Sequence, residues 1–199
     1  MLEVESLGIP NVKKISQRPQ NHTELMTGEN ITWSWRLFRK VVDTALKPIV
    51  METEIHIDRA LSLRGMYYTV APRTNSLFIR ALSGSVYVNA LDLRENSRTY
   101  GKSTGCEISA ENKAQIYIPE DFAWGLLSLS DDTLLICKSS NYISDEYTGI
   151  LNYADPALNI YWPEKPVYVS PLVKFAPGIS DFEARTQMEL IDSQETDLV

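Results

Sequence analysis

The residue types that most often carry acid–base or metal chemistry are scarce in this sequence. Its 199 residues include two histidines, His22 and His56, and two cysteines, Cys106 and Cys137. The histidines are far apart and neither has a neighbouring His or Cys, which argues against a transition-metal site built from several His ligands. Two cysteines do not make a disulfide framework, so we expect free thiols in a reducing compartment.

Composition and charge exclude further classes of protein. The chain carries 19 Lys and Arg against 26 Asp and Glu, a net charge of −7, which argues against a nucleic-acid partner because neutralising phosphates needs a basic surface. The hydrophobic share of 44% suits one folded domain. No apolar run approaches the roughly 18 residues of a membrane span, and the N-terminus lacks a signal-like apolar stretch. We therefore expect a cytoplasmic protein with no membrane contact.

The elements that must position any chemistry are mainly strands. Residues 1–30 are polar and are expected to be irregular. The spacing of Trp33, Leu37 and Val41 then predicts a helix that ends at Pro48. From residue 50 to about 140, short runs rich in β-branched and aromatic residues alternate with turn residues, which predicts an all-β sandwich or barrel. The predicted strands are 53–57, 63–70, 76–82, 84–92, 105–109, 114–118, 125–129 and 133–138. The last twenty residues hold six acids and one Arg, and predict a helical or frayed acidic tail.

Five segments carry a family resemblance. They are LRGMYY at 63–68, DLRENSRTYGK at 92–102, ISAENKAQIYIPEDFAWG at 108–125, KSSNY at 138–142 and DPALNIYWP at 155–163. In this order and spacing they resemble the dTDP-4-dehydrorhamnose 3,5-epimerase family over roughly residues 50–165. The resemblance implies a cupin-like jelly-roll β-barrel at 49–165, preceded by an N-terminal arm and short helix at 1–48 and followed by a C-terminal tail at 166–199 that packs on the barrel.

The resemblance also implies an activity, an isomerase reaction of deoxysugar and polysaccharide biosynthesis. Members of the family are dimeric, need no metal or cofactor, and act on a 4-keto-6-deoxyhexose attached to a nucleotide. A proton next to the ketone, at C3 or C5, is removed and returned to the opposite face. Such chemistry needs a base that is active near neutral pH, an acid on the other face, and donors that stabilise the enolate.

The catalytic positions of the family hold other residues here. By the resemblance, Tyr67 replaces the base His, Trp124 replaces a second His, and Cys137 stands at the position of the acid Tyr. The Asp that supports the base has no clear equivalent near Val173. A free phenol is ionised to roughly one part in a thousand at pH 7, whereas a free thiol is ionised to a few per cent. Two interpretations stay open: Cys137 acts as base with Tyr67 as acid, or both side chains pack inside the barrel.

The binding positions are also inferred from the resemblance. Arg64 keeps the residue that pairs with the nucleotide diphosphate in the family, a role that suits a bidentate guanidinium; its alternative is a salt bridge that shapes the turn before Gly65. Trp124 either lines the sugar pocket or blocks it. Tyr142 matches an aromatic near the nucleobase. Because the base, the acid and the second His are all replaced, a catalytically inactive homologue that acts as a binding or scaffold protein is the alternative function.

Overall fold

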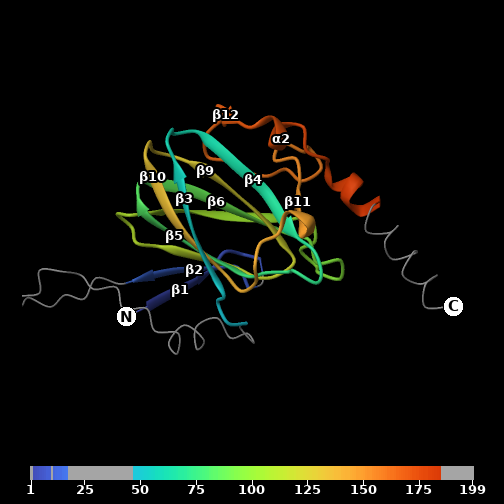
Figure 1. Ribbon diagram of the computed structural model, residues 1–199, viewed down its shortest axis with the longest axis horizontal. Coiled ribbons are helices and arrows are strands. Elements are labelled where there is room, and N and C mark those ends of the chain that lie inside the picture. The colour runs from blue at the N-terminus through green and yellow to red at the C-terminus, as the bar shows by residue number, and fades with distance from the viewer. Residues whose placement is uncertain (1, 10, 18–46, 185–199) are drawn as a thin grey trace, which may run out of the picture.

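Two antiparallel sheets make up most of the protein. The computed structural model describes residues 2–9, 11–17 and 47–184. In the first sheet the order is β1 (Leu2–Ser6), β2 (Lys13–Gln17), β8 (Gln115–Ile118), β5 (Leu77–Ser83), β10 (Thr133–Ser139) and β3 (Met51–Ile57). In the second it is β11 (Thr148–Ile150), β4 (Ser62–Thr69), β9 (Phe122–Ser128), β6 (Ser85–Asp92) and β7 (Ser103–Ser109), with β12 (Tyr168–Val169) pairing β4 in parallel. The sheets lie face to face (Figure 1), which confirms the predicted jelly-roll barrel.

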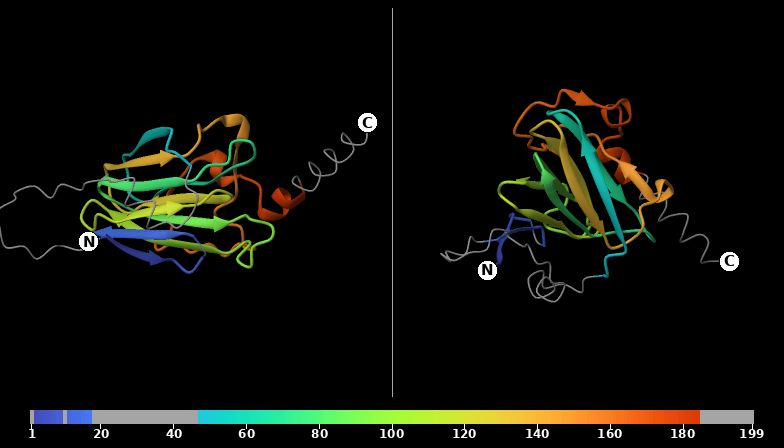
Figure 2. Two further views of the ribbon diagram at one scale, coloured as in Figure 1. Left: turned by 90° about the horizontal axis from the view of Figure 1, so that it is seen from below. Right: turned by 60° about the vertical axis from the view of Figure 1, so that its left-hand side comes forward.

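The predicted strands between residues 53 and 138 are all present, with ends shifted by at most three residues. The expectation that residues 1–30 are irregular is wrong for β1 and β2, which pair as a hairpin. Strand β2 also pairs with β8, so the hairpin lies at one edge of the sandwich (Figure 2). Few apolar residues mark this hairpin, but Val12 and Ile15 are buried. The predicted helix after Trp33 and the tail beyond residue 184 lie outside the described residues, and the domain boundaries stay predictions.

The core lies between the two sheets. Strand β3 shows the underlying alternation, because Thr53, Ile55 and Ile57 are at least partly buried while the residues between them are exposed. Inward-facing apolar side chains from both sheets meet in one cluster. Its fully buried members include Ile79, Ile116, Leu135, Val86, Val88, Ile108 and Leu126.

The chain after β10 covers the outer face of the second sheet (Figure 1). It passes through the 3₁₀ turn η1 (Asp145–Tyr147) and the one-turn helix α2 (Pro171–Lys174). Val173 of α2 packs on Leu63 and Leu127, while Leu151 and Ile179 pack in a cluster with Met66. Segment 150–182 therefore supports β4 from behind.

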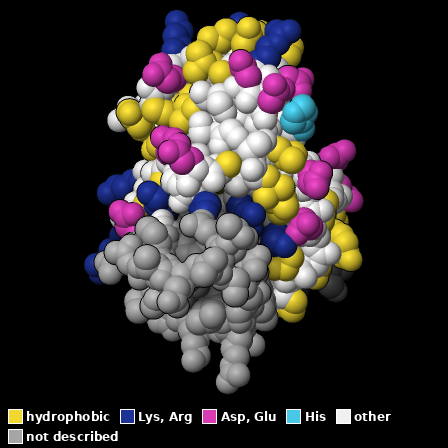
Figure 3. Space-filling model, turned by 90° about the vertical axis from the view of Figure 1, so that its left-hand side faces the viewer, with side chains coloured by type: hydrophobic (Ala, Val, Ile, Leu, Met, Phe, Trp, Pro, Cys, Tyr) yellow, Lys and Arg dark blue, Asp and Glu magenta, His cyan; other side chains and the backbone are white. Residues whose placement is uncertain are grey.

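One face of the described protein carries mixed charges. On the face in Figure 3, basic and acidic side chains are interspersed with hydrophobic ones. Within the described part of the chain, no helix has the length and hydrophobicity to cross a membrane.

A buried carboxylate organises the loop that follows β6. Asp92 is 0% exposed and accepts hydrogen bonds from the Arg94 guanidinium at 2.7 and 2.9 Å, from Ser97 at 2.7 Å and from Thr99 at 2.6 Å. Burial alone would raise the pKa of Asp92, but these hydrogen bonds outweigh it and lower the pKa to about 2. Because the folded pKa is depressed, the carboxylate stabilises the fold above its unfolded pKa, and that stability is lost as the pH falls towards 2.

We predict that Asp92→Asn lowers the free energy of unfolding by about 2 kcal/mol at pH 7. The difference from the wild type should shrink as the pH falls from about 5 to about 2. Urea unfolding across this range measures both effects. Glu95→Gln, on the same loop and exposed, is the control and should change stability by less than about 0.5 kcal/mol. A pH-independent loss in Asp92→Asn would contradict the assignment.

Candidate functional site

An irregularity in β4 brings two of the predicted site residues to the same face. Arg64 pairs with Leu126 and Tyr67 pairs with Trp124, so three steps along β4 match two steps along β9. In a regular strand, residues three apart point to opposite faces. The extra residue makes a bulge, and both Arg64 and Tyr67 follow Leu126 and Trp124 toward the space between the sheets.

Gly65 makes the bulge possible. Its φ of +99° lies in the region that side chains rarely adopt, and a Cβ built there would lie 2.5 Å from the carbonyl oxygen of Trp124 and 2.7 Å from the Cα of Gly125. Two backbones therefore approach at this point, as only glycine permits. Met66, the next residue, turns outward and is fully buried in the cluster behind the sheet.

A pocket of about 600 Å³ lies at the outer edge of β4 and contains Arg64 and Tyr67. Its other lining residues come from the start of β4 and from the segment around β12: Ser62, Leu63, Val167, Tyr168, Val169, Ser170 and Val173. A groove of about 770 Å³ lies at the other end of β4, beside the Asp92 loop and Phe182. We take the smaller pocket as the candidate site because it holds two sequence-predicted residues, whereas the groove holds none.

Arg64 brings a positive charge and Tyr67 an aromatic ring to this pocket. The exposed Arg64 guanidinium donates one hydrogen bond, 2.9 Å long, to the carbonyl oxygen of His56 on β3. A guanidinium has five N–H donors, so this bond orients the group without using all of them. The rings of Tyr67 and Trp124 are half-buried and 5.5 Å apart between centroids. Trp124 also packs against the core cluster and is not among the residues that line the pocket.

Cys137 does not share this pocket. Its side chain points inward from β10 but belongs to the apolar cluster and is 3% exposed. Burial raises the pKa of the Cys137 thiol to about 12, the opposite of what a base at neutral pH needs. We therefore assign Cys137 to the core, which was the second interpretation of this residue.

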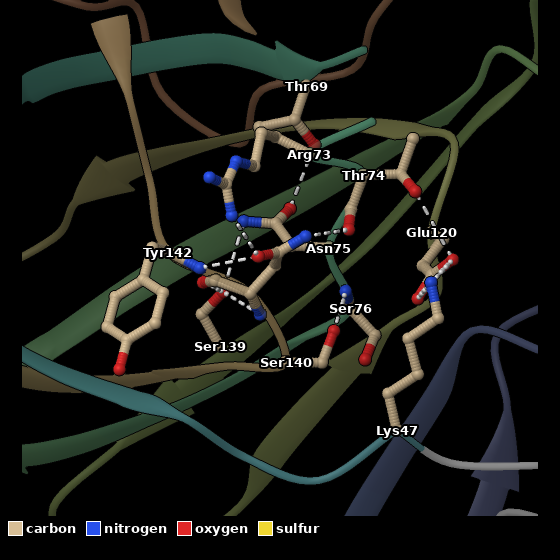
Figure 4. Close-up of polar contacts among 11 residues, drawn as sticks. Lys47, Thr69, Arg73, Thr74, Asn75, Ser76, Glu120, Ser139, Ser140 and Tyr142 are labelled. Carbon is tan, nitrogen blue, oxygen red and sulfur yellow. Dashed lines mark hydrogen bonds and ion pairs between the residues drawn. The ribbon is translucent and has the colours of Figure 1, made fainter. Parts of the chain in front are cut away.

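Buried polar side chains close the barrel end beyond Tyr67. Thr69, two residues further along β4, donates to Asn75 at 3.0 Å, and the Asn75 amide donates to Ser139 at 3.1 Å (Figure 4). Ser139 lies two residues after Cys137 on β10, so this chain joins the two sheets above the core. The backbone N–H of Ser76 donates to Ser140 at 2.9 Å beside it. The network is satisfied internally, which makes it a rigid rim for the interior.

Tyr142 lies on this rim and not in the pocket. It is 60% exposed, and its ring points away from the cluster in Figure 4. Arg73 donates to Asn141 at 3.4 Å, and Lys47 pairs with Glu120 at 2.9 Å nearby. The role of Tyr142 at a nucleobase stays a prediction.

Sequence reasoning missed the rim and the far wall of the pocket. Ser139 and Ser140 belong to the KSSNY segment, so the motif contained a signal for the rim. Tyr168 and Val167 carry no motif, and the parallel pairing of β12 with β4 that places them is a tertiary contact.

In the described ranges, no three His, Cys, Asp or Glu side chains gather as a metal site.

Comparisons with known proteins agree with this architecture. The sequence model of the family described as dTDP-4-dehydrorhamnose 3,5-epimerase matches residues 16–181. The enzyme of that name from Sinorhizobium fredii is 33% identical over 166 residues, which cover 83% of each protein. The one from Shigella flexneri is 41% identical over 102 residues, 51% of this chain and 56% of that protein, so this second match spans about half of each.

Solved structures resemble nearly the whole chain. The crystal structure of dTDP-4-dehydrorhamnose 3,5-epimerase from Elizabethkingia anophelis has a TM-score of 0.80 at 26% identity, covering 90% of this chain and 97% of that one. The structure of dTDP-6-deoxy-D-glucose-3,5-epimerase from Legionella pneumophila, in complex with dTDP-4-keto-L-rhamnose, has a TM-score of 0.79 at 25% identity, covering 90% and 94%.

We predict that Gly65→Ala destabilises the protein by about 3 kcal/mol, since a left-handed φ costs roughly 1–2 kcal/mol and overpacking adds a similar amount. Gly101→Ala is the matched control, because Gly101 also has a positive φ of 70° but nothing within 4 Å of a built Cβ. It should cost only about 1 kcal/mol. Chemical denaturation measures both; equal losses would show that the close approach at Gly65 is unimportant.

We also predict that Cys137 is unreactive in the folded protein. Cys106 is also a free, buried thiol. The test therefore uses a Cys106→Ala variant, in which Cys137 is the thiol that the reagent reports. Ellman's reagent at pH 8 should modify Cys137 at least about 100-fold more slowly in the native protein than in denaturant, because burial withholds the thiolate. A native rate close to the denatured rate would restore Cys137 as a candidate base.

Proposed function

Because the chain belongs to the dTDP-4-dehydrorhamnose 3,5-epimerase family, we propose that it binds a nucleotide-linked 4-keto-6-deoxyhexose in the pocket at β4. The observation that carries this proposal is the bulge that turns Arg64 and Tyr67 into one pocket. Arg64 supplies a guanidinium suited to the diphosphate, and Tyr67, backed by its ring contact with Trp124, supplies an aromatic surface suited to a sugar ring.

In this proposal Tyr67 is the group that exchanges a proton with the sugar. The ketone at C4 acidifies the hydrogens at C3 and C5; removal of one gives an enolate, and its return to the opposite face gives the epimer. Cys137 is placed in the core, so the swapped pair of Cys137 base and Tyr67 acid is not retained. Tyr67 as its phenolate takes the proton from one face at C3 or C5, and a water on the opposite face gives a proton to the enolate carbon. The hydroxide left behind takes the proton back from Tyr67.

Binding without turnover is the second candidate function. The burial of Cys137 and the raised pKa of its thiol favour it, because they remove the second proton-transfer group that the resemblance offered. In this version the protein keeps the ligand site of its family and acts as a binding or scaffold protein. Homodimer formation and a cytoplasmic location remain part of the proposal.

The two functions separate in deuterated water. We predict that dTDP-4-keto-6-deoxyglucose gains deuterium at C3 or C5 above an enzyme-free blank, and that Tyr67→Phe slows this exchange by about 100-fold, the usual contribution of a positioned acid or base. Calorimetry should show that Tyr67→Phe still binds the ligand. Cys137→Ala is the control and should exchange like the wild type.

Each alternative outcome has one meaning. Exchange that is equally fast in Tyr67→Phe would exclude Tyr67 as the proton carrier. Binding by the wild type without exchange would support the binding function, and no binding of the nucleotide sugar would refute both functions.

A further inference from the structure

The groove beside the Asp92 loop is separate from the candidate site. Its volume of about 770 Å³ lies within the range of small-molecule sites. None of the described residues that line it also lines the pocket that contains Arg64 and Tyr67. Its walls are the end of β4 with the residues that follow, the loop at 93–99, Asp121 and Phe182. The proposed function gives this groove no role.

One side of the groove is apolar and held in place by packing. The rings of Tyr68 and Phe182 meet edge to face with their centroids 5.0 Å apart, and both pack against the cluster that contains the buried Leu93. A Cβ placed on Gly149 of β11 would overlap the Tyr68 ring, so β11 packs closely on this ring. These side chains offer a ligand an apolar surface that does not have to be ordered first.

Hydrogen bonds to a buried carboxylate hold the other side. The loop at 93–99 is fixed by Asp92, which accepts from the Arg94 guanidinium, from Ser97 and from Thr99. Asp92 also neutralises the charge of Arg94. These three donors therefore serve mainly to hold the loop, and the loop is rigid before any ligand binds.

Other polar side chains of the groove are available to a ligand. Asn96 and Arg98 are exposed, and neither forms a hydrogen bond or an ion pair with any described residue. Asp121, just before β9, is exposed as well. Its backbone carbonyl accepts a 3.1 Å hydrogen bond from the N–H of Leu93, whereas its carboxylate accepts none from the described residues. The groove therefore presents free donors on the loop and a free acceptor beside Leu93.

The charges of the described lining balance. Arg94 and Arg98 are offset by Glu95 and Asp121. A multiply charged ligand such as a diphosphate is bound by an excess of opposite charge, which the described lining does not have. A sugar ring matches this lining better, because it is uncharged, its C–H faces pack on apolar surfaces, and each hydroxyl both donates and accepts hydrogen bonds.

We propose that this groove is a second binding site, which takes a short, neutral carbohydrate chain. The faces of the sugar rings lie on Tyr68 and Phe182, and hydroxyls at their edges bond to Asn96, Arg98 and Asp121. The inference goes beyond the proposed function, which uses a different pocket. It assigns the buried Asp92 network a purpose, since that network holds the loop that carries the donors.

The experiment is saturation-transfer NMR of the full chain with the neutral trisaccharides maltotriose, cellotriose and mannotriose. The wild type should bind at least one of them, with a millimolar Kd that does not change with salt, because salt screens only charges. Arg98→Ala should raise this Kd about tenfold and Asp121→Asn about fivefold, since the first removes a hydrogen bond to a charged group and the second weakens one. Phe182→Ala should raise it about tenfold by removing apolar contact area.

Two control variants test the location. Phe175→Ala removes a ring that is 79% exposed and outside the groove lining, so it should leave the Kd unchanged. Arg64→Ala alters the pocket of the proposed function and should also leave the Kd unchanged. Melting temperatures measured on the same samples show whether each variant is folded.

Each remaining outcome overturns the carbohydrate site. Binding of none of the trisaccharides does so, and so does a Kd that Arg64→Ala raises while the folded groove variants leave it unchanged. Trigalacturonate, a charged trisaccharide, is the comparison ligand. If it binds more tightly than every neutral one, the groove selects an anion. All of these results leave the proposed function standing, because that function is tested with a different ligand in a different pocket.

Discussion

Apolar packing between the two sheets is the constraint on which the rest of the structure depends. The sheets meet through alternating inward side chains, and burying these surfaces is the main driving force for the fold. The same packing decides where chemistry can occur. A group in the middle of this layer, such as Cys137, is removed from water and from any ligand. Polar side chains gather where the layer ends, as at the Thr69–Asn75–Ser139 rim and at the flank beside β4.

The bulge at Gly65 is the local exception that creates a site. A regular β4 would direct either Arg64 or Tyr67 into the layer of side chains behind the sheet, since the two are an odd number of residues apart. The extra residue instead directs both toward one pocket and places Met66 behind the sheet. The cost is a backbone conformation that glycine tolerates and a close contact with the Trp124 backbone. Segment 150–182 packs on the outer face of β4, and β9 pairs with β4 within the sheet. These two contacts hold the bulge in position.

These features explain which parts could be predicted from the sequence. Strands such as β6 and β8 alternate or are continuously apolar, and their composition alone predicted them. The hairpin of β1 and β2 was missed because its strands are short and largely polar, and it is held by pairing with β8, a contact about a hundred residues away in the chain. The motif around Arg64 and Tyr67 was recognisable, but its bulge was not, because register depends on the partner strand. Tyr168 has no sequence signal at all, since its position comes from the parallel pairing of β12 with β4.

The burial of Cys137 and the position of Arg64 limit which side chains could take part in proton transfer. Burial in the core raises the pKa of the Cys137 thiol, which makes it a poor base at neutral pH. Arg64 is the cation of the motif that shares a pocket with Tyr67. The diphosphate of a bound nucleotide sugar would draw on the same positive charge, because a guanidinium forms its strongest contacts with phosphate. In the proposed function, a bound diphosphate and Tyr67 would therefore share the one cation among the described residues that line this pocket.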